Sequence, residues 1–237
     1  MTVTRSLYFT NDDVAFTSSA IDSILEIKTV HEDLGASGVA LWFEHTGRNF
    51  GALELISSFH SYAHMGEVTK QFRNLGVSGG RLRNESRSSA VQLTSAWNCD
   101  ISWLFGRKWT DLEEDELEEV SIFVEYPINV AAELKPFSAE RFDVVDVLDP
   151  LAKIVDAEGG FAGLRSITSG SLPGGGQLSN YTAVFDLFFK DWPAYERALS
   201  SFNSESILTD LARRSTGIPF IGTSRIKTRL DIEGHFA

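Results

Sequence analysis

The 237-residue chain lacks several features that assign a protein to a class. It has a single cysteine, Cys99, so no internal disulfide can form and no thiolate cluster can hold zinc or an iron–sulfur centre. No apolar run reaches the roughly 18 residues that cross a membrane, and the amino end lacks the basic and apolar pattern of a secretion signal. We therefore expect a cytoplasmic protein with no membrane partner.

Positive charge is also scarce, with 21 Lys and Arg against 33 Asp and Glu and a net charge of −12. This balance repels phosphate backbones unless a basic face is segregated, so we expect no nucleic-acid partner. Seven of the ten residues from 110 to 119 are acidic. We interpret this run as a solvated linker or short helix rather than a cation site, and we predict no metal site in the chain.

What the chain does contain is a plan repeated in its two halves. When residues 51–60 are laid on 181–190, at an offset of about 130, Phe59 meets Phe189 and Phe72 meets Phe202. The apolar content of 43% is enough for one large core or for two small cores of roughly 110 residues each. The match predicts two equivalent units in one chain.

Each half has the pattern strand, helix, strand, strand, helix, strand. In the first half we predict strands at 3–10, 38–45, 50–60 and 91–105, with helices at 20–34 and 63–75. In the second half we predict strands at 121–130, 161–169, 181–190 and 219–230. The helices of that half run from about 138 to 156, where Pro150 should kink or shorten the helix, and from a cap at Asp191.

This order of elements, given twice, resembles the dimeric α/β-barrel superfamily. Its most specific local pieces are FFKDWPAY at 188–195 and FHSY at 59–62, which are similar to a strand-to-helix segment of the antibiotic-biosynthesis monooxygenase branch. The resemblance implies an α+β fold of two tandem ferredoxin-like (βαββαβ) units, packed sheet to sheet as an internal pseudo-dimeric barrel. The units would span 1–110 and 121–237, with 111–120 as the acidic linker.

The resemblance also implies a pocket, either within the barrel or between the sheet and the helices of one unit. Members of the superfamily include monooxygenases without metal or flavin, lactone isomerases, polyketide cyclases and haem enzymes. Fold analogy alone does not choose among them.

The geometry of the first hairpin suggests which side chains face a pocket. With Gly47 and Arg48 at the centre of the turn, Leu41 lies opposite Glu54, and one strand face carries a mixture of apolar and polar groups. That face comprises Leu41, Phe43, His45, Glu54, Ile56, Ser58 and His60. A slip of one residue would exchange the two faces.

Glu54, His60 and His45 are the candidate catalytic residues, because imidazoles and an enclosed carboxylate can transfer protons near neutral pH. The competing interpretation is that both histidines are solvated, at a strand end and beside a turn, and that Glu54 is exposed at an edge. Other candidates for substrate binding lie elsewhere on the predicted strands. They are Phe43, Ser58, Asn98, Asp100, Arg165 and Asp186.

Trp97-Asn98 superficially resembles a tryptophan and asparagine pair of the monooxygenase branch. Adjacent strand residues point in opposite directions, so both line one cavity only if a bulge intervenes. A second departure concerns haem, because the haem enzymes of the superfamily hold iron through a histidine of the second unit. Residues 121–234 contain no histidine, so we expect no bound cofactor.

The sequence therefore predicts a small-molecule enzyme of secondary metabolism, acting on an aromatic or polyketide-like substrate. A cyclase or isomerase that uses acid–base chemistry is favoured, and a cofactor-independent monooxygenase is the variant. The alternative is a binding or carrier module that sequesters a hydrophobic ligand. Either protein could be a monomer or a homodimer.

Overall fold

The computed structural model describes residues 2–11, 18–46, 50–74, 91–104, 116, 118–128, 140–170, 183–204 and 224–231. Within these ranges, eight strands and four helices repeat the order β-α-β-β-α-β. The first half contains β1 (Thr2–Asn11), α1 (Ser18–Asp33), β2 (Ser37–Glu44), β3 (Leu53–Phe59), α2 (Tyr62–Asn74) and β4 (Val91–Leu104). The second contains β5 (Ile122–Ile128), α5 (Glu140–Ala157), β6 (Phe161–Gly170), β7 (Ala183–Phe189), α6 (Trp192–Phe202) and β8 (Arg225–Arg229). The predicted order of elements is confirmed.

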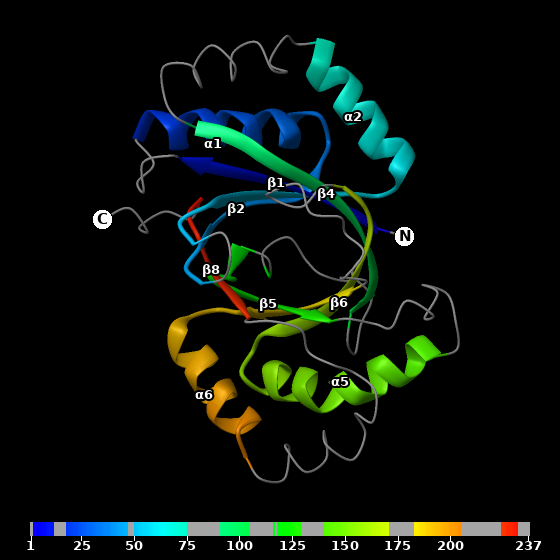
Figure 1. The fold of residues 1–237 in the computed structure, drawn as a ribbon, viewed down its shortest axis with the longest axis vertical. Helices are drawn as coiled ribbons and strands as arrows, with labels where there is room; N and C mark the ends of the chain where they lie inside the picture. The colour runs from blue at the N-terminus through cyan, green and yellow to red at the C-terminus, as the bar shows by residue number, and fades with distance from the viewer. Residues whose placement is uncertain are drawn as a thin grey trace.

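The described strands form one closed, antiparallel barrel in the order β1-β3-β2-β8-β5-β7-β6-β4. Each half has the same internal arrangement, with its fourth, first, third and second strands side by side. The halves join edge to edge, because β2 pairs with β8 and β4 pairs with β6. Helices α1 and α2 cover one side of the barrel and α5 and α6 cover the opposite side (Figure 1).

Local sequence signals explain the helix boundaries of the second half. The Asp191 side chain accepts a hydrogen bond of 2.7 Å from the backbone N–H of Ala194, which caps α6, and Pro193 lies in the first turn as predicted. In α5, however, the helix continues through Pro150 to Ala157 instead of ending early. Leu148, Leu151 and Val155 bury one face of that helix against the barrel, and this packing maintains the helix despite the missing N–H.

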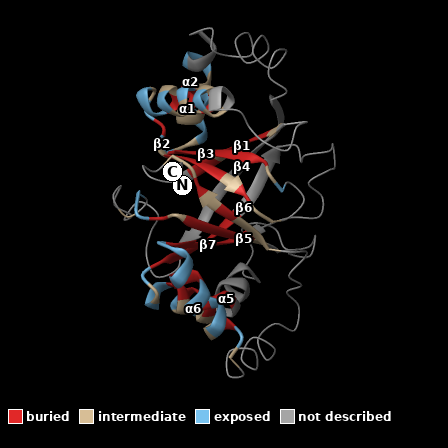
Figure 2. Cartoon of the chain, turned by 90° about the vertical axis from the view of Figure 1, so that its left-hand side faces the viewer, coloured by how far each residue is buried: buried red, intermediate tan, exposed pale blue. Residues whose placement is uncertain are grey.

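Two apolar clusters lie between the helices and the barrel wall (Figure 2). In the first half, Ile24 and Ile27 of α1 pack on Leu41 and Leu55 of the sheet. In the second half, Leu148 and Val155 of α5 pack on Phe185. A third cluster includes Trp42, Phe123 and Phe188, and it lies on the opposite faces of the strands, inside the barrel. Most strands are therefore buried on both faces.

None of the helices in the described ranges is long and apolar enough to cross a membrane.

Candidate site inside the barrel

Alternation along the strands divides the buried side chains between the helix layers and the barrel interior. On β3, Leu53, Leu55 and Phe59 face the helices, whereas Ile56 and Ser58 line an interior cavity. Glu54 shares the parity of Ile56 and is fully buried. The prediction that Glu54 and Ser58 share a face is therefore confirmed.

The predicted register of the first hairpin is wrong by one residue. Trp42, not Leu41, pairs with Glu54, and Leu41 pairs with Leu55. Trp42 therefore faces the barrel interior, while Phe43 packs against the helix-side cluster. The cause is a bulge at Gly51, which has a φ of 84°: its N–H donates to the Glu44 carbonyl at 2.9 Å, and the Glu44 N–H donates to the Ala52 carbonyl at 3.0 Å.

An ionic cluster occupies one part of the barrel interior. Lys227 of β8 lies between two carboxylates: it contacts Glu54 Oε2, and its Nζ is 2.7 Å from Glu125 Oε2. All three side chains are fully buried. Arg225 adds a second cation at 2.9 Å from Glu125, and the Tyr8 hydroxyl lies 3.3 Å from Lys227 Nζ.

Arg165 of β6 extends this cluster towards the cavity. Its Nη2 donates to Glu125 Oε1 at 2.5 Å and to Asp186 Oδ1 at 2.9 Å, and its Nε donates to Asp186 Oδ2. The Phe123 ring lies beside both cations, 5.5 Å from Arg165 Cζ and 5.0 Å from Lys227 Nζ. A continuous chain of charges thus runs from Asp186 in the second half to Glu54 in the first.

The interior carboxyl groups differ in pKa. Burial alone would raise the pKa of Glu125, but Arg225, Lys227 and Arg165 outweigh it and hold that pKa well below its ordinary range. Burial raises the pKa of Asp186 to about 6, although Arg165 opposes the rise. Burial also raises the pKa of Glu44 to about 7, against the effect of Lys227 and Arg225. Asp186 and Glu44 are therefore placed to exchange protons near neutral pH.

Next to the ionic cluster lies a cavity in which the centres of water-sized molecules can occupy about 60 Å³. Its wall is mainly apolar, with Arg165, Asp186 and the hydroxyls of Thr4 and Ser58 among the polar groups. The other lining residues are Gly38, Ala40, Trp42, Ile56, Val120, Phe123, Gly163, Phe188 and Arg229. An apolar cavity with a few convergent polar groups is the usual form of a small-molecule site.

The structure brings some of the predicted site residues together and separates others. Arg165, Asp186 and Ser58 line the cavity, and Glu54 is linked to it through Lys227 and Glu125. Asn98 and Asp100 belong to β4, where Asn98 pairs with Arg5 and Ser169 along the backbone. The side chains of β4 lie outside the described part of the chain.

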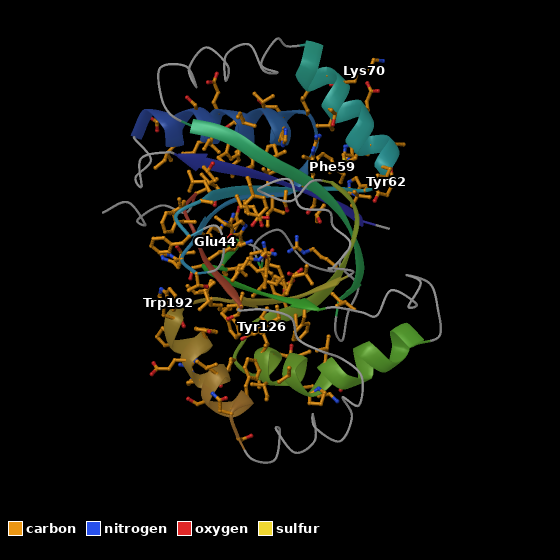
Figure 3. The ribbon with its side chains drawn as sticks, viewed as in Figure 1. Glu44, Phe59, Tyr62, Lys70, Tyr126 and Trp192 are labelled. Atoms are coloured by element: carbon orange, nitrogen blue, oxygen red, sulfur yellow. The ribbon has the colours of Figure 1, made fainter. Side chains whose placement is uncertain are left out.

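The two histidine candidates lie outside the barrel interior. His60 is exposed at the end of β3, where its ring stacks on His64 with centroids 5.3 Å apart. His45 Nε2 is 2.6 Å from the Thr228 hydroxyl, and the His45 ring contacts Trp192 at the start of α6. Figure 3 shows Glu44 among the interior side chains and Trp192 on the outside.

Sequence reasoning missed Glu125, Arg225, Lys227 and Tyr8. A signal was present, because Arg225, Lys227 and Arg229 occupy alternate positions of one strand and so share a face. A strand with one charged face is usually solvated on that face, and only closure of the barrel places these cations inside.

Comparison with known proteins shows the fold but not a family. No protein-family model matches the chain, and no curated protein matches its sequence. Among solved structures, an anthrone oxidase-like protein superposes with a TM-score of 0.55 at 11% identity, over 97% of this chain and 91% of that one. A candidate chlorite dismutase superposes with a TM-score of 0.53 at 13% identity, over 97% of this chain and 95% of that one. A haem-binding protein from Thermus thermophilus superposes with a TM-score of 0.50 at 10% identity, over 97% of this chain and 91% of that one. The chain thus has the α/β-barrel fold of the dimeric α/β-barrel proteins.

The second half of this chain lacks the side chains that most often ligate a haem iron. Between residues 121 and 234 the sequence contains no histidine, cysteine or methionine to serve as an axial ligand. The space between α5, α6 and the barrel is filled by close-packed side chains such as Phe185, Phe189 and Tyr195, each at most 9% exposed. Within the described ranges there is also no group of three or more His, Cys, Asp or Glu arranged to hold a metal ion.

Proposed function

We propose that the chain is an enzyme that transfers protons on a small molecule bound in the barrel cavity. The observation that carries the proposal is the position of Asp186: it lines the cavity, it is hydrogen-bonded by Arg165, and its pKa is raised to about 6. A carboxyl group whose pKa is near the working pH is suited to act first as a base and then as an acid.

The chemistry follows from the groups that line the cavity. Asp186 would take a proton from a carbon next to a carbonyl group, and the electron pair would move to the carbonyl oxygen. Arg165 would stabilise that developing negative charge. Return of the proton from Asp186 to another carbon of the enolate completes an isomerisation. In a cyclisation the enolate carbon attacks a second carbonyl, the π electrons of that carbonyl move to its oxygen, and Asp186 returns its proton to the resulting alkoxide. In the monooxygenase variant dioxygen is the oxidant: the enolate carbon would bond to it, Asp186 would return its proton to give a hydroperoxide, and loss of water from that hydroperoxide would leave a ketone. The similarity to an anthrone oxidase-like protein supports that variant.

A second candidate function is binding without turnover. The observation that favours it is the close pairing of Asp186 with Arg165, which engages both carboxylate oxygens in hydrogen bonds. A carboxylate held in this way positions a ligand well but exchanges protons less readily.

We also propose that the chain is a tandem duplication of a ferredoxin-like unit, spanning 1–110 and 121–237 around an acidic linker at 111–120. The identical strand arrangement of the two halves supports this proposal. Membership of the antibiotic-biosynthesis monooxygenase branch, and a role in secondary metabolism, remain part of the same hypothesis.

Isomerisation of cyclohex-3-enone to cyclohex-2-enone tests the enzyme proposal, because the ring is small and the conjugated product is followed by its ultraviolet absorbance. We expect the wild type to accelerate the reaction and Asp186→Asn to lose about a hundredfold or more in rate. Asp156→Asn, on the exposed face of α5, is the matched control. Glu54→Gln and His60→Ala, measured alongside with melting temperatures, decide whether the first hairpin takes part. No acceleration across a series of cyclic ketones would favour the binding module.

A further inference from the structure

We infer that the cavity selects an uncharged molecule no larger than about one six-membered ring that carries a hydrogen-bonding oxygen, and that it rejects carboxylates of the same size. The inference rests on the proposed function only in using the same cavity. It concerns which ligands enter, not what is done to them.

The size of the ligand follows from the volume of the cavity. A cavity of about 150 Å³ accommodates benzene, whereas this cavity offers about 60 Å³. One ring is therefore the upper limit of what the cavity takes, and a fused tricyclic molecule does not fit.

The charge of the ligand follows from the ions already present. Among the described residues, four carboxyl groups (Glu44, Glu54, Glu125 and Asp186) share the interior with the cations Arg165, Arg225 and Lys227. When Glu44 is protonated, the other three carboxyl groups match the three cations in number. The additional cation at the cavity wall, Arg229, donates to Asp231 at 2.8 Å.

An entering anion would therefore find every one of these cations engaged by a carboxylate. It would have to break an existing ion pair or remain uncompensated in a buried site, and both are costly. An uncharged ligand meets no such penalty.

The hydrogen-bonding requirement follows from Thr4. Its side chain is only 3% exposed and lines the cavity, yet its hydroxyl has no hydrogen-bond partner among the described residues. A buried hydroxyl without a partner is unusual, and a ligand oxygen within the cavity would supply one. Thr4 pairs across the sheet with Ser58, which also belongs to the lining.

The rest of the wall accommodates the ring. Trp42, Phe123 and Phe188 are mutually packed, with Phe123 and Phe188 stacked at a centroid distance of 4.6 Å. Aromatic rings prefer such neighbours in offset or edge-on contact. The ligand would therefore lie between aromatic side chains, with its oxygen at Thr4.

Binding of three monocyclic probes at pH 7.5 tests the inference: phenol, which is uncharged, benzoate, which is an anion, and toluene, which lacks an oxygen. Dissociation constants are measured by ligand-observed NMR on the full chain. We expect phenol to bind most tightly and benzoate to bind more than about tenfold more weakly. Thr4→Val keeps the shape of the side chain and should weaken phenol about tenfold, to near the affinity of toluene. Thr29→Val, on helix α1 away from the barrel, should leave all three affinities unchanged.

Benzoate binding as tightly as phenol would overturn the inference, and so would an unchanged phenol affinity in Thr4→Val or no binding of phenol. These outcomes are distinct from failure of the proposed enzyme. Selective phenol binding without cyclohexenone isomerisation would keep the ligand specificity and remove the enzyme. Isomerisation with a preference for benzoate would keep the enzyme and remove the specificity.

Discussion

Glu125 on β5 and Lys227 on β8 form an ion pair of 2.7 Å in which neither side chain is accessible to solvent. Lys227 also contacts Glu54 of β3, so one ammonium group connects the two halves of the barrel. Its removal leaves two buried carboxylates without that cation, which is among the most destabilising single changes known in proteins.

Lys227→Met should therefore lower the free energy of unfolding by about 3 to 5 kcal/mol. Lys190→Met is the matched control, because Lys190 is exposed and pairs with Glu119 at the surface, and it should change stability little. The measurement is urea unfolding at pH 7. An equally small effect of both substitutions would contradict the assignment of Lys227 to the sealed interior.

Glu44 should make the protein less stable as the pH rises. Burial raises the pKa of Glu44 to about 7 from an ordinary value of 4.5, so the folded state holds a proton that the unfolded state has already released. Stability from this group is complete below about pH 4.5 and is lost between pH 4.5 and 7. Glu44→Gln should remove this loss. The free energy of unfolding of the variant, relative to that of the wild type, should therefore rise by on the order of 2 kcal/mol between pH 5 and pH 8. Glu196→Gln, on the exposed face of α6, should show no such gain.

His31 should act in the opposite direction. It lies in the last turn of α1, where its Nδ1 is 2.8 Å from the Ser57 hydroxyl, and burial together with the nearby Arg5 lowers its pKa to about 4. The unfolded state takes up a proton near pH 6.5, so stability falls as the pH drops from about 6.5 to 4, by on the order of 2 kcal/mol.

The two effects overlap between pH 4.5 and 6.5 and partly cancel in the wild type. Asp186, whose raised pKa of about 6 also makes stability fall as the pH rises, is present in all the proteins compared. Relative to the wild type, Glu44→Gln should therefore become more stable as the pH rises through that window, and His31→Gln should become less stable. Titration of the His31 ring by NMR gives an independent check. A protonated imidazole at pH 6 would exclude this account.

Gly160 follows α5 at a point where the chain passes close to β7. A Cβ there would lie 2.2 Å from the backbone oxygen of Phe188 and 2.9 Å from Val155 Cγ1, and neither the strand nor the helix can move without breaking its own packing. Gly160→Ala should cost more than about 2 kcal/mol. Gly66→Ala, within α2 and with nothing within 4 Å of the added carbon, should instead stabilise by up to about 1 kcal/mol. Thermal unfolding measures both variants, and we expect the melting temperature to fall in Gly160→Ala and to rise in Gly66→Ala.

The order of elements followed from the sequence because each signal is local. Alternation marked β1, an apolar run marked β7, and the Asp191 cap fixed the start of α6 without reference to other parts of the chain. The faces of β3 were also assigned correctly, since Leu53 and Leu55 are apolar and alternate with Glu54.

The faces of β2 were not assigned correctly, and the reason is a bulge. Gly51 and Ala52 both oppose Glu44, so one extra residue enters the hairpin and the pairing shifts by one residue. Strand alternation alone does not reveal such an extra residue, although a glycine is the residue that the bulge needs.

The sequence by itself determined the repeated pattern of strands and helices, the absence of a histidine ligand for haem in the second half, and the candidates Arg165 and Asp186. Only the tertiary structure decided that Glu54, Glu125 and Lys227 meet, and that the histidine candidates His45 and His60 lie outside. The physical reason is closure of the barrel: periodicity shows which residues share a strand face, whereas pairing of β2 with β8 and of β4 with β6 decides that this face is enclosed rather than solvated.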